Sequence, residues 1–263
     1  MKTEADAQSS DISLALESWY AGRGGHLLDA TRTRLQATLD LAFGYHILQT
    51  GPLAGHNLIS ESPINHHIVA SDNVFGGPGL LCHGDELPFD SDSVDMVVAF
   101  HALEFSTHPH ACLREIQRVL RPRGHLAIIG FNPHSLPGLW RRLRALRGDG
   151  LWSHHRPVSL QRLTDWLHLL DCQMESVRQL YPIPPRGHGR LRRCIDAVDA
   201  WAMRYDLPGG SLYLAHAIKQ IPGARRPRLV AAAQRTRLVG LAVAGQPTAA
   251  PRHQRTPGED RAA

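Results

Sequence analysis

The sequence predicts an α/β protein whose mostly parallel sheet carries helices on both faces. Residues 94–100 form an apolar run that is too short for an independent helix and fits a strand covered on both faces. A helix is predicted after Pro109, because apolar residues then recur at helical spacing, at Leu113, Ile116, Val119 and Leu120. A basic turn ending at Gly124 stops this helix, and residues 125–130 supply a second buried strand. Strand, helix and strand in this order form a βαβ unit, which implies a parallel sheet.

Two helices are predicted before the sheet. Residues 11–20 have Asp11 as a candidate N-cap and place four large apolar side chains on one face, namely Ile12, Leu16, Trp19 and Tyr20. The glycines of residues 22–25 end this helix. Residues 29–43 then repeat apolar side chains at intervals of four, at Leu35, Leu39 and Phe43.

The later elements continue the alternation of strands and helices. Residues 45–55 are placed as the first strand and a turn, and further strands are predicted at 67–71, 80–83, 172–181 and 211–221. Helices are predicted at 140–148, 160–170 and 191–205. Ser159 is expected to cap the helix at 160–170. The arginines of the helix at 140–148 are expected on a solvated face.

The composition is that of a chain with one sizeable core. The chain has 263 residues, of which 43% are hydrophobic, and its four cysteines include no C-x-x-C pair. A reducing compartment is therefore expected, without a disulfide framework or a zinc site. The polar, acidic start of the chain does not read as a signal peptide, and no apolar run approaches the ~20 residues needed to span a bilayer. We expect a cytoplasmic protein with no membrane partner.

The positive charge lies at the end of the chain. Residues 222–263 contain eight arginines against Glu259 and Asp260, a net of +6, whereas the whole chain carries +5. These residues also lack a sustained apolar period, so we predict a disordered basic tail that contacts anionic partners weakly. We expect the folded body to comprise N-terminal helices in residues 1–43 packed on a domain of residues 44–221.

Residues 87–124 carry a resemblance to a known family. They contain LPFDSDSVD at residues 87–95, then Leu103-Glu104, then L-x-E-x-x-RVL-x-P-x-G at residues 113–124. This sequence pattern is similar to the second half of the class I S-adenosylmethionine-dependent methyltransferase domain, of type 11. The similarity extends more loosely over roughly residues 40–220. The resemblance implies a Rossmann-like fold with a seven-stranded sheet whose last strand is antiparallel. It also implies N-terminal helices near the substrate; the alternative is plain packing on the sheet edge.

The resemblance assigns the cofactor loop to the residues after the first strand. The family pattern is an acid, one residue and G-x-G-x-G. Here Gly51 and Gly55 remain, Gln49 replaces the acid and Leu53 replaces the middle glycine. Glycines in such loops let the backbone approach the ligand closely. We therefore predict an S-adenosylmethionine loop that is degenerate at two positions.

Acidic residues follow the next two predicted strands. Asp72 stands seventeen residues after Gly55, the place of the family's ribose-binding acid. The alternative is a turn aspartate before Asn73. Asp85 and Glu86 both suit the acid that accepts from the adenine amino group, and the alternative there is a solvated acidic loop.

The carboxyl ends of the two central strands hold the catalytic candidates. Ligands bind at these ends in open α/β sheets. His101 and Glu104 follow the fourth strand, and Asn132 follows the fifth. We predict that His101 contacts the cofactor, that Glu104 or, alternatively, His101 serves as the base where the acceptor loses a proton, and that Asn132 orients the substrate. The seventeen histidines form no recognisable metal-ligand set with carboxylates, so no metal is expected.

The resemblance implies a methyltransferase that uses S-adenosylmethionine and a small-molecule acceptor. Two alternatives stay open. One is a non-catalytic methyltransferase-like binding or scaffold protein, which Gln49 and Leu53 favour. The other is a different nucleotide-using α/β enzyme.

Overall fold

The computed structural model describes residues 2–22, 24–73, 79–148, 150–180 and 210–221, with side chains from Ser9 onward. These residues belong to one compact unit, Met1–Arg225. The predicted helix at 191–205 and the predicted tail at 222–263 lie outside the described residues.

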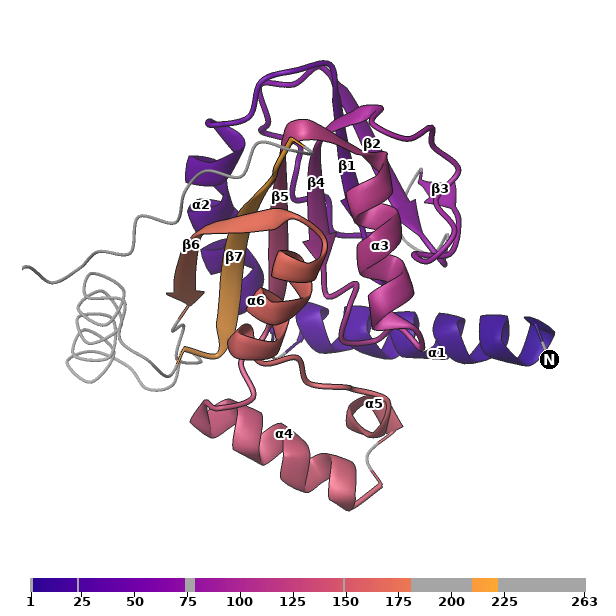
Figure 1. Cartoon of the computed structure of the whole chain (residues 1–263). Helices are drawn as coiled ribbons and strands as arrows, with labels where there is room; N and C mark the ends of the chain where they lie inside the picture. Colours follow the sequence, from indigo (N-terminus) through magenta and orange to yellow (C-terminus); the bar gives the residue numbers. More distant parts are fainter. Residues whose placement is uncertain (1, 23, 74–78, 149, 181–209, 222–263) are drawn as a thin grey trace, which may run out of the picture. The chain divides into compact units, whose positions relative to one another are not determined.

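A seven-stranded sheet forms the centre of this unit (Figure 1). Its strands, in chain order, are β1 His46–Thr50, β2 His66–Ser71, β3 Leu80–Leu81, β4 Val94–Phe100, β5 Leu120–Phe131, β6 Cys172–Leu180 and β7 Leu212–Lys219. Their order in the sheet is β3-β2-β1-β4-β5-β7-β6. Strands β1 to β5 pair in parallel, and β7 runs antiparallel to both β5 and β6. The predicted mostly parallel sheet with an antiparallel last strand is confirmed.

Helices cover both faces of the sheet. They are α1 Lys2–Ala21, α2 Gly25–Leu39, α3 Pro109–Val119, α4 Leu136–Leu146, α5 Gly150–Ser153 and α6 Leu160–Leu169. One apolar cluster joins α1, α2 and α5 to one face, through Leu16, Leu35 and Trp152 against Met96, Val98 and Phe131. The other joins α3 and α6 to the opposite face, through Ile116 and Leu163 against Val97 and Leu126. Among the helices in the described part of the chain, none is long and apolar enough to cross a membrane.

The N-terminal helices differ from the predicted ones at their ends. Helix α1 begins at Lys2, so Asp11 lies inside the helix and is not an N-cap. The preceding residues KTEADAQ include strong helix formers, which extend the helix toward the N-terminus. Helix α2 begins at Gly25 and ends at Leu39, which leaves Phe43 outside it and exposed.

The predicted basic helix is displaced and turned. Helix α4 begins at Leu136 after Ser135, whose hydroxyl accepts a hydrogen bond from the Gly138 N–H at 2.9 Å. Arg141 is only 4% exposed. The expected solvated face of arginines is therefore wrong at Arg141, because this side chain lies over the Phe131 ring at 4.3 Å.

Glycine is required where β1 ends. Gly51 has φ +142°, and a Cβ at this position would lie 2.0 Å from the Phe100 carbonyl oxygen at the end of β4. The ends of two neighbouring parallel strands can approach this closely only because residue 51 has no side chain. This contact lies at the carboxyl edge of the sheet, where the loops after β1, β2 and β4 meet.

Candidate functional site

A cavity of about 240 Å³ lies at the carboxyl edge of the sheet. The loops after β1, β2, β3 and β4 supply most of its wall. They contribute Thr50, Gly51, Pro52, Ser71, Asp72, Cys82, His83, Gly84, Asp85, Ala102, Phe105, Ser106 and Thr107. Helix α1 adds Ser9 and Ile12, and the segment around the end of α5 adds Ser153, His154 and Arg156. The position is the one where open α/β sheets bind ligands.

Three of the six predicted cofactor residues line this cavity. They are Gly51, Asp72 and Asp85, which come from the loops after β1, β2 and β3. The half-buried Asp72 accepts hydrogen bonds from the Ser9 hydroxyl and, at 3.5 Å, from the Ser71 hydroxyl. The structure thus brings together a close-approach glycine and two carboxylates that lie far apart in the sequence.

The other three predicted cofactor residues lie away from the wall. Gly55 is exposed, and its N–H donates to the Glu17 carboxylate at 3.2 Å. Glu86 is exposed, and its N–H donates to the His83 carbonyl at 3.1 Å. His101 is completely buried.

The two unusual residues of the cofactor loop have structural partners. Leu53 is 1% exposed and packs in the core with α1 and α2. The Gln49 side-chain amide bonds to the loop through both of its polar atoms. Its Nε2 donates to the His56 carbonyl at 2.8 Å, and its Oε1 accepts from the Leu58 N–H at 2.8 Å. A carboxylate could accept from Leu58 but could not donate to His56. The glutamine is therefore suited to closing this loop on itself.

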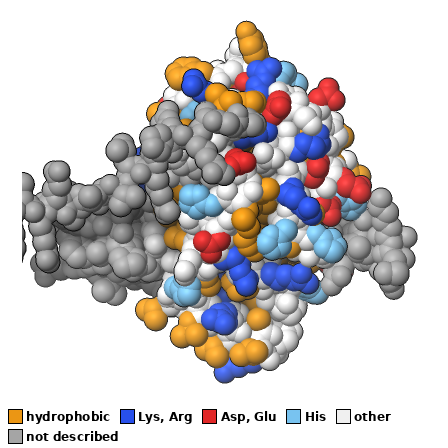
Figure 2. Space-filling model, viewed as in Figure 1, with side chains coloured by type: hydrophobic (Ala, Val, Ile, Leu, Met, Phe, Trp, Pro, Cys, Tyr) orange, Lys and Arg blue, Asp and Glu red, His pale blue; other side chains and the backbone are white. Residues whose placement is uncertain are grey.

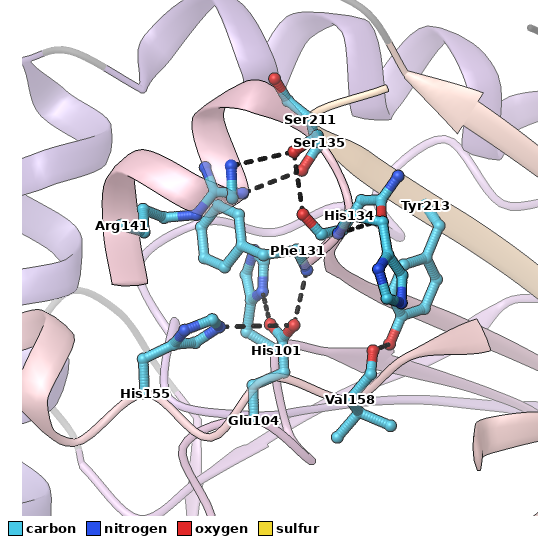
Figure 3. A network of polar contacts seen from close by, with 12 residues as sticks. His101, Glu104, Phe131, His134, Ser135, Arg141, His155, Val158, Ser211 and Tyr213 are labelled. Carbon is cyan, nitrogen blue, oxygen red and sulfur yellow. Dashed lines mark hydrogen bonds and ion pairs between the residues drawn. The ribbon is translucent and has the colours of Figure 1, made fainter. Parts of the chain in front are cut away.

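A buried polar chain lies behind the cavity (Figure 3). The Tyr20 hydroxyl lies 2.6 Å from His101 Nε2, and His101 Nδ1 lies 2.7 Å from Glu104 Oε2. The other oxygen of Glu104 accepts from the Phe131 N–H at 2.6 Å and lies 3.6 Å from His155 Nε2. His101 adopts a left-handed backbone conformation, φ +55°, directly after β4. This unusual conformation turns the chain so that the carboxylate reaches back beneath β5.

Burial and hydrogen bonding determine the protonation states of Tyr20, His101 and Glu104. Burial alone would raise the pKa of Glu104, but the hydrogen bond with His101 and the nearby His155 ring outweigh it and lower the pKa to about 2. Burial lowers the pKa of His101, more strongly than Glu104 raises it, and burial raises the pKa of Tyr20. Glu104 is therefore ionised and His101 neutral near pH 7. Because a carboxylate only accepts, His101 carries its proton on Nδ1, and Tyr20 donates to Nε2.

The two predicted catalytic residues both bond to groups of the protein itself. Glu104 is 1% exposed and is not part of the cavity wall. Asn132 is also buried: its Oδ1 accepts from the His134 N–H at 3.0 Å, and its Nδ2 donates to Gln179 Oε1 at 3.3 Å. Within the described residues, no group of three or more His, Cys, Asp or Glu side chains could hold a metal ion.

The sequence did not single out the part of the wall formed by α1 and α5. Helix α1 was expected either to pack on the sheet or to lie near the substrate. Its Leu16 and Tyr20 pack in the core, and its Ser9 and Ile12 line the cavity. His154 and Arg156 follow α5, and the Arg156 N–H donates to the Glu104 carbonyl at 2.8 Å. Two neighbouring histidines and an arginine after a loop have no periodicity that distinguishes a cavity wall from a solvated turn.

Comparisons with known proteins agree with the fold. Residues 65–128 match the family described as "Methyltransferase domain". The Escherichia coli protein YafS is 33% identical over 149 residues, which cover 56% of this chain and 60% of YafS. The ubiquinone/menaquinone biosynthesis C-methyltransferase UbiE of Paraburkholderia phymatum is 38% identical over 98 residues, 36% of this chain and 39% of UbiE. The chain thus matches less than two thirds of the length of either relative.

Solved structures show the same fold at low sequence identity. A SAM-dependent methyltransferase from Thermotoga maritima superposes with a TM-score of 0.61 at 15% identity, over 81% of this chain and 99% of that one. One from Archaeoglobus fulgidus gives a TM-score of 0.53 at 16% identity, over 78% and 99% of the two chains. With the strand order, these superpositions show that the described residues have the Rossmann-like fold of S-adenosylmethionine-dependent methyltransferases, and residues 65–128 match the methyltransferase domain family.

Proposed function

We propose that this protein binds S-adenosylmethionine in the cavity at the carboxyl edge of the sheet and transfers its methyl group to a small-molecule acceptor. The observation that carries the proposal is the meeting of Gly51, Asp72 and Asp85 in one cavity wall. These are residues to which the family resemblance assigns cofactor contacts. The relative UbiE is a ubiquinone/menaquinone biosynthesis C-methyltransferase, which supports the same reaction class.

Each of the three residues has a chemical task in this proposal. Gly51 lets the backbone lie close to the ligand, because no Cβ intervenes. The Asp72 carboxylate can accept from both ribose hydroxyls, and Asp85 can accept from the adenine amino group. Of the two neighbouring acids, Asp85 suits this role better than Glu86, because only Asp85 lines the cavity.

The protein's contribution to the chemistry in this proposal is orientation. When bound, S-adenosylmethionine supplies a methyl group that is already reactive toward nucleophiles. The loops after β1 and β4 and helix α1 hold the reactants in line. Glu104, with a pKa of about 2, is a weak base. We assign it the task of fixing His101 and the end of β5, and we assign Asn132 that of shaping the turn into α4.

Two observations favour the non-catalytic alternative. The Ser9 hydroxyl bonds to the carboxylate that would bind the ribose. The cavity of about 240 Å³ is also smaller than the roughly 300–1,000 Å³ of typical ligand pockets. A protein that kept this arrangement permanently would bind the cofactor poorly. Leu53 argues against a blocked site, because its side chain lies in the core and not in the cavity.

Calorimetric titration with S-adenosylmethionine and with S-adenosylhomocysteine tests the proposal. We expect saturable binding of both by the full-length protein. Asp72→Asn should weaken binding by about 10- to 100-fold, because it removes a charged hydrogen-bond acceptor. Asp29→Asn, on the exposed side of α2, is the matched control and should bind as the wild type does. Absence of heat with either ligand at millimolar concentration would leave the non-catalytic alternative in place.

A further inference from the structure

Helix α4 turns its large apolar side chains away from the protein. There are five of them, and the last four lie three, four, seven and ten positions after the first. This spacing places all five in one stripe along the helix. They are between 45% and 85% exposed: Leu136, Leu139, Trp140, Leu143 and Leu146. We call this set the α4 stripe. Contiguous apolar surface of this kind marks an interaction site.

The inward side of α4 explains why the stripe faces outward. Gly138 packs so closely that a Cβ would lie 2.3 Å from the Asn132 carbonyl oxygen. Arg141 is buried over the rings of Phe131 and Trp152, and its Nη2 donates to the Ser211 carbonyl at 3.2 Å. A glycine and a bonded arginine therefore occupy the places that leucines take in an ordinary surface helix. The orientation is fixed by specific contacts, and the leucines are left outside by that packing.

Positive charge borders the α4 stripe. Arg142 and Arg147 are exposed, and the half-exposed Arg144 lies over the Trp140 ring at 4.6 Å. The sequence contains no Asp or Glu between Glu115 and Asp149. Figure 2 shows hydrophobic and basic side chains gathered at the lower end of the view, where Figure 1 draws α4. An apolar stripe between arginines is the pattern of helices that lie in a membrane interface.

We propose that α4 docks on an anionic phospholipid surface. The leucines and Trp140 would enter the boundary between headgroups and acyl chains, and the arginines would contact headgroup phosphates. Eleven residues of helix reach about 16 Å, enough to lie along the interface and too short to cross it. The exposed arginines beside the α4 stripe match the negative charge of phospholipid headgroups, which favours an anionic lipid surface as the occupant. This proposal replaces the expectation from the sequence that the protein has no membrane partner.

The position of α4 relates this surface to the cavity. The chain passes from α4 through α5 to Ser153, His154 and Arg156, which line the cavity. Docking of α4 would therefore hold one wall of the cavity close to the lipid. The proposal does not depend on methyl transfer, since the stripe and its arginines are present whether or not the cavity binds a cofactor.

Sedimentation with lipid vesicles tests the proposal on the full-length protein. We expect binding to vesicles of equimolar phosphatidylcholine and phosphatidylglycerol, and little binding to phosphatidylcholine alone. The double variant Leu139→Ser, Leu143→Ser should reduce binding at least tenfold. Leu169→Ser on α6, where the leucine is 82% exposed, is the matched apolar control and should bind as the wild type does. Arg142→Gln with Arg147→Gln should reduce binding by roughly fivefold for each charge, whereas Arg114→Gln with Arg162→Gln should change it little.

Because all substituted side chains are exposed, unchanged thermal unfolding should confirm that the variants are folded. The proposal is overturned if the wild type does not bind anionic vesicles. It is also overturned if the serine variant binds as well as the wild type, which would assign binding to another basic segment such as residues 222–263. A dimer that the serine variant abolishes, without vesicle binding, would identify a second copy of the chain as the occupant.

Discussion

The Ser9 hydroxyl donates a hydrogen bond to the Asp72 carboxylate, across 63 positions of the sequence. This bond ties α1 to the loop after β2, in the wall of the cavity. It uses Oδ2, one of the two carboxylate oxygens that a bound ribose would use in the proposed manner. Ser9 therefore competes with the cofactor for Asp72.

Replacement of Ser9 by Ala should strengthen cofactor binding. The change removes a competing donor from Asp72, and we expect a gain of roughly fivefold in affinity for S-adenosylhomocysteine, since the bond is half-exposed and worth about 1 kcal/mol. Titration calorimetry measures the effect. Ser18→Ala, at an exposed position of the same helix, is the control and should leave affinity unchanged. Weaker binding by the Ser9 variant would instead make Ser9 part of the ligand site.

Replacement of Leu53 by Gly should mainly affect stability. The side chain is buried in the core, so its loss and the added backbone freedom should lower the free energy of unfolding by roughly 2–4 kcal/mol. Affinity for the cofactor should rise little, because Leu53 does not line the cavity. Leu53→Ala separates lost packing from backbone freedom. A tenfold gain in affinity in the glycine variant would show that the leucine blocks the ligand.

Replacement of Glu104 by Gln should destabilise the protein by about 2–4 kcal/mol. The carboxylate is buried and accepts from both His101 and the Phe131 N–H, and an amide cannot replace both bonds. His101→Gln should cost a similar amount, and the double variant should cost about 1–3 kcal/mol less than the sum. Urea unfolding of the three variants measures this coupling. If the Glu104 variant instead kept full stability and lost methyl transfer, a catalytic role for the carboxylate would be supported.

The parts of the fold that are predictable from the sequence are those set by local patterns. Residues 84–131 show two buried runs and, between them, a helical pattern that begins at Pro109, and β4, α3 and β5 occupy this stretch. The predicted basic turn before Gly124 is wrong, because β5 already begins at Leu120. Asp72 and Asp85 are found because each follows a strand, and parallel strands bring their carboxyl ends to one edge.

The remaining features depend on contacts between distant residues. Gln49 reads as a departure from a motif until the hydrogen bonds to His56 and Leu58 are known. The orientation of α4 depends on Arg141 finding Phe131 and Ser211, and helical periodicity alone would place the leucines inside. Glu104 sits beside a conventional binding edge, but its bonds to His101 and Phe131 turn it inward. In each case a tertiary contact decides between two readings that are equal in the sequence.

The stability of the protein should fall in mild acid, and His216 should account for part of the fall. The His125 and His216 rings stack across β5 and β7 with a 4° angle between planes, and His125 Nδ1 lies 2.9 Å from His216 Nε2. Burial lowers the pKa of both rings, and the neighbouring His125 helps to lower that of His216 to about 4. In the unfolded chain a histidine binds its proton near pH 6.5. Between about pH 6.5 and 4 the unfolded state therefore binds more protons, so this contribution to stability is complete above pH 6.5 and is lost as the pH falls.

Urea unfolding at a series of pH values tests this expectation. Each such histidine can contribute up to about 1.4 kcal/mol per pH unit, and His101, whose pKa is also lowered, acts in the same direction. His216→Gln should make the fall between pH 6.5 and 4 shallower, because it removes one buried base. His168→Gln, at an exposed position on α6, should keep the slope of the wild type. If the His216 variant kept that slope as well, His216 would not be the proton-linked group, and the fall in stability would be assigned to the other histidines whose pKa is lowered, His125, His101 and His56.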